Sequence, residues 1–120
     1  EVAIDRIITL EPQLSRMAAG NPGFDLIELG ANGTPYRWIE VKAMTGSLAD
    51  RPVGLSKTQF DLAAKKGDAF WLYVVERATD ADKIRVLRIQ DPAGKAKTFT
   101  FDQGWVAIAH LDPPEIALPG

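Results

Sequence analysis

The chain has 120 residues, no cysteine and a single histidine, His110. These scarcities exclude disulfides, thiolate zinc sites, cysteine nucleophiles and metal sites built from several histidines. No apolar run approaches the roughly 20 residues that a membrane-spanning helix needs, and no secretory signal is visible. The absence of cysteine fits a reducing compartment, and we expect a cytoplasmic protein.

Two further classes are excluded by what is missing. The chain has no glycine-rich phosphate loop of the ATPase type, and one late histidine does not allow a serine–histidine–aspartate triad. Its 16 acidic and 14 basic residues give a net charge of −2, which argues against a protein that holds nucleic acid by bulk charge alone. A local basic patch remains compatible with that balance.

The composition is that of a globular domain, with 46% hydrophobic and 25% charged residues, and the length suffices for one core. We expect a single domain over residues 1–111 and a proline-containing tail or linker over 112–120. Because the chain begins at Glu1 without an initiator methionine, we also expect it to be a piece of a larger protein.

The order of predicted elements indicates an α/β fold. The elements are a helix within 2–18, strands over 24–29 and 36–43, a helix from 56–59 to Gly67, a strand over 69–75, and a hairpin of strands over 84–90 and 98–102 with its turn at 91–94. Pro12 interrupts the first helix. An Asn-Gly turn joins the first two strands, and a capping box from Ser56 to Gln59 starts the second helix.

Three charged side chains converge if the first two strands are neighbours. Side chains alternate along a strand, so Glu40 and Lys42 point to one face and Val41 points to the other. Asp25 enters the preceding strand and can reach the same place. Charges on a buried strand are costly unless they meet a partner or a metal. Two carboxylates and an ammonium suit a divalent cation and an activated water, which is the chemistry of phosphodiester hydrolysis.

The charges suggest a role for each residue. We expect Asp25 and Glu40, with the Val41 backbone carbonyl, to bind one Mg²⁺ or Mn²⁺, and Lys42 to orient or deprotonate the attacking water. A Glu-x-Lys triplet alone is common by chance, and Asp25 can instead cap a turn. Gln59, as part of a capping box, needs no further function.

Four segments carry a specific resemblance: NPGFDL, WIEVKA, LSKTQFDLA and FWLYVVE. In this order, over roughly residues 11–77, they resemble the Protein NO VEIN C-terminal domain family, which looks like a branch of the PD-(D/E)XK nuclease superfamily. The resemblance implies a restriction-endonuclease-like core, a mixed central sheet flanked by helices. The family pattern has glycine and an aromatic residue before the aspartate, as Gly23 and Phe24 are here. It usually has glycine where this chain has Ala43, and often glutamate at Gln59.

The resemblance also bears on accessory residues and partners. Related nucleases often carry an extra acid on the first helix, which implies such a role for Glu11, although a surface glutamate beside Pro12 is the simpler interpretation. For Gln59 the two expected roles are an accessory residue of the site and a helix cap. Such domains are often attached to helicases and other ATPases of defence or DNA-repair systems, so we expect a partner of this kind.

Arg51 and Lys57 are the candidates for contacts to nucleic-acid phosphates, because a lysine at a helix start is not explained by the helix macrodipole. We expect a metal-dependent endonuclease that cleaves DNA, with a homodimer as one way to cut both strands. Two alternatives stay open. One is a catalytically silent nucleic-acid-binding or protein-docking module on the same fold, and the other is a protein-interaction domain without a nucleic-acid role.

Overall fold

The computed structural model describes residues 2–18, 21, 23–49, 51, 53–95 and 109–110, and within them the expected α/β class is confirmed. In chain order the elements are α1 (Val2–Leu10), β1 (Leu14–Arg16), β2 (Leu26–Leu29), β3 (Pro35–Ala43), α2 (Lys57–Lys66), the short 3₁₀ helix η1 (Gly67–Ala69), β4 (Phe70–Glu76), β5 (Arg85–Gln90) and α3 (Pro92–Lys95). With at most 10 residues each, none of the described helices is long and apolar enough to cross a membrane.

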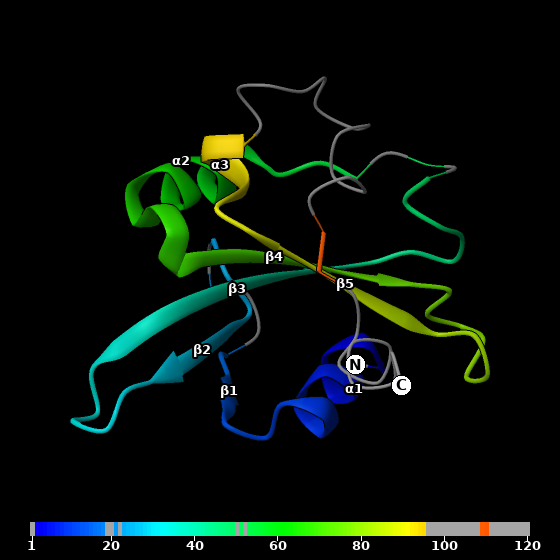
Figure 1. The fold of residues 1–120 in the computed structure, drawn as a ribbon, viewed down its shortest axis with the longest axis horizontal. Helices are drawn as coiled ribbons and strands as arrows, with labels where there is room; N and C mark the ends of the chain where they lie inside the picture. Colours follow the sequence, from blue (N-terminus) through cyan, green and yellow to red (C-terminus); the bar gives the residue numbers. More distant parts are fainter. Residues whose placement is uncertain are drawn as a thin grey trace.

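The strands form one mixed sheet in the order β1-β2-β3-β4-β5 (Figure 1). The first three strands are antiparallel neighbours, β3 and β4 are parallel, and β5 is antiparallel to β4. Because parallel neighbours need a crossover connection, α2 carries the chain from the end of β3 back to the start of β4. This arrangement is compatible with a restriction-endonuclease-like core.

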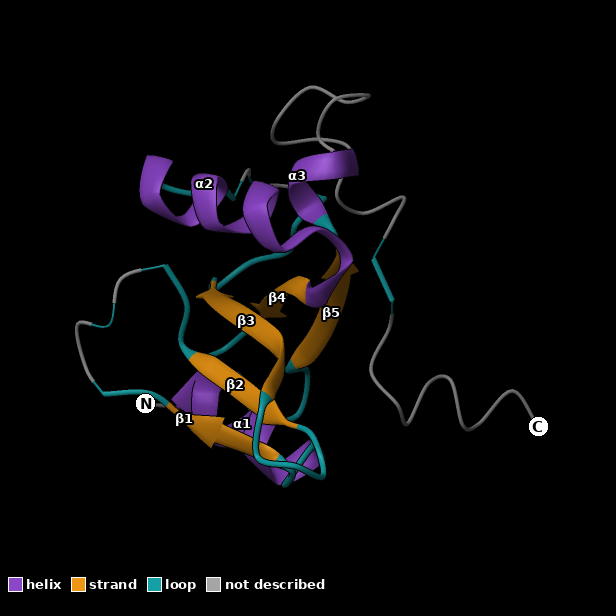
Figure 2. Ribbon diagram, turned by 90° about the vertical axis from the view of Figure 1, so that its left-hand side faces the viewer, coloured by secondary structure: helices purple, strands orange, loops and turns teal. Residues whose placement is uncertain are grey.

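Helices cover both faces of the sheet, with α1 on one face and α2 and α3 on the other (Figure 2). We call these the α1 face and the α2 face. The core of the α1 face includes Ile7, Ile39 and Tyr73, whereas Leu72 and Phe70 belong to clusters of the α2 face. Burial of β4 on both faces explains its almost unbroken apolar sequence.

The predicted capping box starts α2. The Ser56 side chain accepts from the Gln59 amide while the Gln59 side chain accepts from the Ser56 amide, and the helix ends at Gly67, where φ is +59°. The Lys66 ammonium lies 4.1 Å from the centre of the Trp38 ring. The C-terminal end of α2 therefore covers the start of β3, and its N-terminal end runs toward the end of β3.

Three features differ from the sequence expectations. β1 was not predicted, because three residues are too few to show an alternating pattern. The expected turn at 91–94 is the helix α3, which the Asp91 carboxylate starts by accepting from the Gly94 amide at 3.0 Å. The strand expected over 98–102 and the tail over 112–120 lie outside the described residues. His110 instead forms an isolated bridge with Arg88 of β5.

Candidate active site

The predicted acidic residues meet where β2 begins and β3 continues past it. β2 pairs with β3 as far as Leu26 opposite Ile39, whereas β3 runs on to Ala43 beside β4. Asp25, just before β2, therefore faces a part of β3 that β2 does not cover. Its amide donates to the Ile39 carbonyl at 2.8 Å, and its Oδ2 accepts from the Val41 amide at 2.9 Å. These two bonds fix the carboxylate against the backbone of β3.

Glu40 and Lys42 both point to the α2 face, as their spacing predicted. They are in register with Leu72 and Val74 of β4, which belong to the core of that face. Glu40 is buried, with only 5% exposure, and its Oε2 lies 3.6 Å from Lys42 Nζ. The Lys42 side chain is 28% exposed, so the ammonium group lies at the boundary between the buried glutamate and solvent.

The Glu40 carboxyl has an altered acidity. Burial first, and then repulsion from the Asp25 carboxylate, raise the pKa of Glu40 to about 7, and a hydrogen bond with Asp25 acts in the same direction. The Lys42 ammonium partly offsets this rise in pKa. The raised pKa means that the Glu40 carboxyl keeps its proton up to about neutral pH. A cation can replace that proton, because it neutralises the same pair of negative charges.

The available donors fit a small, hard cation. The Ile39 carbonyl and the Val41 amide both bond toward Asp25, and the amide and carbonyl of one strand residue point the same way, so the Val41 carbonyl also projects to this edge. Mg²⁺ is commonly held by one or two carboxylates while water completes its shell. The described residues contain no group of three or more His, Cys, Asp or Glu side chains able to hold a metal. A cation here would therefore rely on two carboxylates, a backbone oxygen and water.

The residues before Asp25 anchor it beneath α2. Gly23 has a φ of +92°, and a Cβ at this position would lie 2.9 Å from Cδ2 of Leu62 on α2. Phe24 packs into the apolar cluster beneath that helix, and its carbonyl accepts from Asn21 Nδ2 at 3.0 Å. The glycine thus allows a close approach that a larger residue would prevent. This segment places Asp25 before the β2 ladder begins.

Glu76, at the end of β4, is a buried acid that sequence reasoning missed. Its Oε2 accepts from the Leu48 amide at 2.5 Å, and its Oε1 lies 3.7 Å from Arg85 Nε. The Met44 amide and carbonyl also bond to the end of β4 and to the turn after it. The loop that follows Lys42 is therefore fastened to the sheet. The available signal was a glutamate ending an otherwise apolar strand.

Glu11 lies on the α1 face, opposite to the face of the Glu40 side chain. Its Oε1 accepts from Arg37 Nη2 and Tyr73 Oη, both at 3.0 Å, and its Oε2 accepts from Arg88 Nε at 2.7 Å. Tyr73 belongs to the core of the α1 face. The structure corrects both interpretations of Glu11: it is neither an acid beside Glu40 nor a surface residue, but the centre of a partly buried polar network.

The network around Glu11 is balanced in charge. Arg37 Nε also donates to Glu28 Oε1 at 2.7 Å, so two arginines face two glutamates. Burial and the nearby Glu11 charge raise the pKa of Tyr73 to about 12, and its hydroxyl therefore stays protonated and donates at neutral pH. Each buried charge meets an opposite charge or a donor, as buried ions require.

Gln59 lies in the capping box described above, with the Ser56 amide 2.8 Å from its Oε1. The capping interpretation of Gln59 is thereby confirmed. This interaction uses the side-chain oxygen and leaves the accessory role without structural support.

Arg51 and Lys57 lie on the surface near the start of α2. Arg51 is exposed, and its amide donates to the Ser47 carbonyl at 3.1 Å. The Lys57 side chain is 88% exposed and pairs with Asp61 one turn along the helix, at 2.9 Å. Exposed pairs of this kind contribute little and exchange partners readily. Contact of these two residues with phosphate stays a prediction.

Together the fold and the site define a mixed α/β domain. Its acidic centre, with a lysine beside it, lies where β3 continues beyond its pairing with β2. A family model described as Protein NO VEIN, C-terminal, matches residues 3–89. Since this match covers more than half of the chain, the chain belongs to that family. The matched segment includes Asp25, Glu40 and Lys42. It extends beyond the predicted range of 11–77 and also covers most of α1 and most of β5. No curated protein and no solved structure matches the chain.

Proposed function

We propose that this chain is a metal-dependent nuclease domain that hydrolyses DNA phosphodiester bonds. The observation that carries the proposal is the convergence of the Asp25 carboxylate, the buried Glu40 carboxyl and the Lys42 ammonium at one uncovered edge of β3. A network made only for stability would pair the two acids with cations, as the Glu11 network does. The resemblance of the same segments to PD-(D/E)XK nucleases supports the same reaction.

The acidic pair is assigned to cation binding. Asp25 and Glu40, with the Val41 carbonyl, would hold Mg²⁺ or Mn²⁺, which when bound stabilises negative charge on the phosphate and lowers the pKa of a bound water. The Val41 amide holds Asp25 in place. Glu40, whose pKa is about 7, releases its proton readily near neutral pH when the site gains positive charge.

Lys42 is assigned to the attacking water and to the charge on the phosphate. Its ammonium group is 3.6 Å from Glu40 and partly open to solvent, so a phosphate approaching from solvent meets it at the mouth of the site. There it would orient the attacking water and stabilise negative charge in the transition state. Arg51 and Lys57, both exposed, would guide the nucleic-acid backbone.

The test is cleavage of supercoiled plasmid and of single-stranded DNA with Mg²⁺ or Mn²⁺. We expect cleavage by the parent chain and none by Asp25→Asn, Glu40→Gln or Lys42→Met. Metal affinity, measured by calorimetry, should fall in the two acid variants and persist in Lys42→Met. Asp82→Asn and Lys83→Gln change exposed charges in the turn before β5, and both should cleave like the parent. Cleavage that survives in Glu40→Gln would refute the proposal.

A silent binding or docking module is the second candidate. It is favoured by the small number of metal donors, since only two carboxylates converge among the described residues, and by the net charge of −2. DNA binding that persists in EDTA, without cleavage, would identify this function. In either case we propose a helicase or ATPase of a defence or DNA-processing system as the partner, which rests on the family resemblance alone. If the domain cuts both strands, a homodimer would supply the second site.

A further inference from the structure

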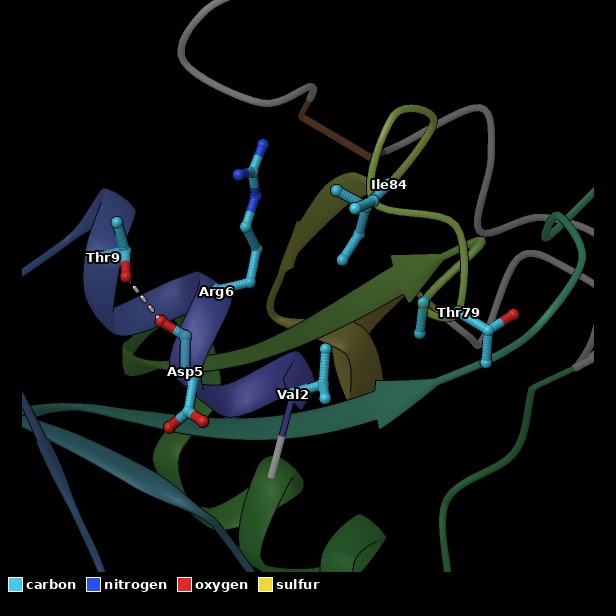
Figure 3. A pocket seen from close by; sticks show the side chains of 8 residues that line it. Val2, Asp5, Arg6, Thr9, Thr79 and Ile84 are labelled. Atoms are coloured by element: carbon cyan, nitrogen blue, oxygen red, sulfur yellow. Dashed lines mark hydrogen bonds between the residues drawn. The ribbon is translucent and has the colours of Figure 1, made fainter.

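A pocket on the α1 side of the molecule lies between α1 and the segment that joins β4 to β5 (Figure 3). Its volume is about 690 Å³, and its apolar lining includes Val2, Ala78 and Ile84. Figure 3 shows Ile84 across the space from α1, with Arg6 extending out of the helix. This volume falls within the roughly 300–1,000 Å³ of small-molecule sites, which combine apolar walls with a few polar groups.

Arg6 is the distinctive polar group of this pocket. The residue is partly buried, and its Nε is buried without a hydrogen-bond partner. No residue in the described part of the chain forms an ion pair with its guanidinium. A buried donor without an acceptor costs free energy and calls for an explanation. On the same side of the sheet, Arg37 and Arg88 both bond to Glu11.

The neighbouring acid does not neutralise Arg6. Asp5 also lines the pocket, but its carboxylate pairs with Arg16 of β1. The Thr9 hydroxyl donates to the Asp5 backbone carbonyl at 2.9 Å, as the dashed line in Figure 3 shows. Both polar neighbours along α1 are therefore engaged elsewhere. Among the described residues, the pocket therefore offers an apolar wall and one guanidinium without a paired carboxylate.

We propose that this pocket binds a small aliphatic carboxylate. The carboxylate would pair with the Arg6 guanidinium, which has the forked geometry for a charge-assisted, two-point contact. The hydrocarbon would lie against Val2, Ala78 and Ile84. Val2 is 65% exposed, so the ligand would remove apolar surface from water. The pocket is lined by α1 and by the segment after β4, so this binding is separate from the proposed nuclease chemistry.

The test is a titration followed by amide NMR spectra, with octanoate as the probe and 1-octanol as its uncharged counterpart. We expect octanoate to shift the amides of Val2, Thr9 and Ile84 in a saturable manner and to bind more tightly than octanol. Arg6→Gln should weaken octanoate about tenfold, the usual worth of one charge-assisted contact, and leave octanol unchanged. Lys83→Gln removes an exposed cation next to Ile84 in the sequence and should leave octanoate binding within about twofold of the parent.

Three results would overturn the proposal. In the first, octanoate produces no saturable shift at these residues. In the second, octanoate and octanol bind equally, or Arg6→Gln and Lys83→Gln weaken octanoate to the same extent, so that Arg6 has no specific role. In the third, only an acetylated and amidated peptide with a glutamate between two leucines shifts these amides, which would make the pocket a protein-docking surface instead. The spectrum of each variant shows directly whether the chain is folded.

Discussion

Glu11 and Glu40 lie on opposite faces of the sheet, both with little exposure to solvent, and the surroundings of their carboxyl groups are opposite. On the α1 face, Glu11 accepts from two arginines and a tyrosine. On the α2 face, Glu40 faces the carboxylate of Asp25, and the Lys42 ammonium lies 3.6 Å from the Glu40 carboxyl. The first carboxylate is neutralised by its neighbours, whereas the second is left with excess negative charge.

This difference in surroundings is the basis of our proposal that one carboxylate is structural and the other functional. Removal of one member of a balanced network leaves a buried charge behind, so the network resists change. An unbalanced pair of acids is costly in the folded chain and becomes favourable only when a proton or cation joins it. Natural chains keep such costs where binding or catalysis needs them. We therefore propose that Glu11 serves stability and that Glu40 serves chemistry.

The largest expected effect is the loss of stability on changing Glu11. Glu11→Gln keeps the shape and removes the negative charge that Arg37 and Arg88 both contact. We expect the free energy of unfolding, measured with urea, to fall by about 3–5 kcal/mol. Nuclease activity per folded molecule should not change, because Glu11 lies on the face opposite Glu40.

A double-mutant cycle controls this prediction. If Glu11 and Arg88 act as a pair, Glu11→Gln combined with Arg88→Gln should cost clearly less than the sum of the two single changes, because both changes remove the same ion pair. Additive losses would mean that the two residues stabilise the fold independently. A loss below about 1 kcal/mol for Glu11→Gln would equate Glu11 with a surface residue and remove the contrast with Glu40.

Replacing Glu40 should raise the free energy of unfolding at about pH 8, whereas replacing Glu11 should lower it. Its pKa is about 7 in the folded chain against an ordinary value of 4.5, so between these values the folded state holds a proton that the unfolded state has released. The stability from this proton is complete below pH 4.5 and is lost as the pH rises to about 7. Glutamine carries no charge at any pH. In EDTA, Glu40→Gln should therefore match the parent below about pH 4.5 and exceed it by about 3 kcal/mol at about pH 8.

This prediction also has a matched control. Glu28→Gln makes the same chemical change in the balanced network, where Glu28 accepts from Arg37 at 2.7 Å, and it should destabilise the chain at about pH 8. If Glu40→Gln were destabilising at that pH as well, the Glu40 carboxylate would be a paired structural charge. Added Mg²⁺ should stabilise the parent and have no effect on Glu40→Gln, because only the parent gains free energy by binding.

Local patterns sufficed to predict the parts of this molecule that depend on short segments. Strand alternation placed Glu40 and Lys42 on one face, the Asn-Gly turn made β2 and β3 neighbours, and four residues defined the start of α2. The position of the site could be predicted for the same reason, since Asp25 and Val41 are only 16 residues apart and belong to one hairpin. The raised pKa of Glu40 does not follow from that spacing, because it depends on how deeply the fold buries the carboxyl group.

The Glu11 network could not be predicted from local sequence patterns. Its bonds join residues 26, 62 and 77 positions apart, and no local pattern encodes such separations. A glutamate beside Pro12 reads as a surface residue until the strands bring Arg37, Tyr73 and Arg88 to it. Glu76 was missed for the same reason, because its partner Leu48 is 28 residues away. Long-range polar partners thus decide whether an acid is structural.

The smallest expected effect tests where the α2-face site ends. Gln59 begins the helix that covers this face, and its side-chain oxygen accepts from the Ser56 amide at 2.8 Å. Gln59→Ala should lower the free energy of unfolding by about 0.5–1 kcal/mol, as loss of a cap does, and leave cleavage per folded molecule unchanged. Gln59→Glu can make the same cap and serves as the matched control, with near-parental stability. Loss of cleavage in Gln59→Ala beyond the loss of folded protein would extend the site to α2, whereas unchanged cleavage would limit it to the β2–β3 hairpin.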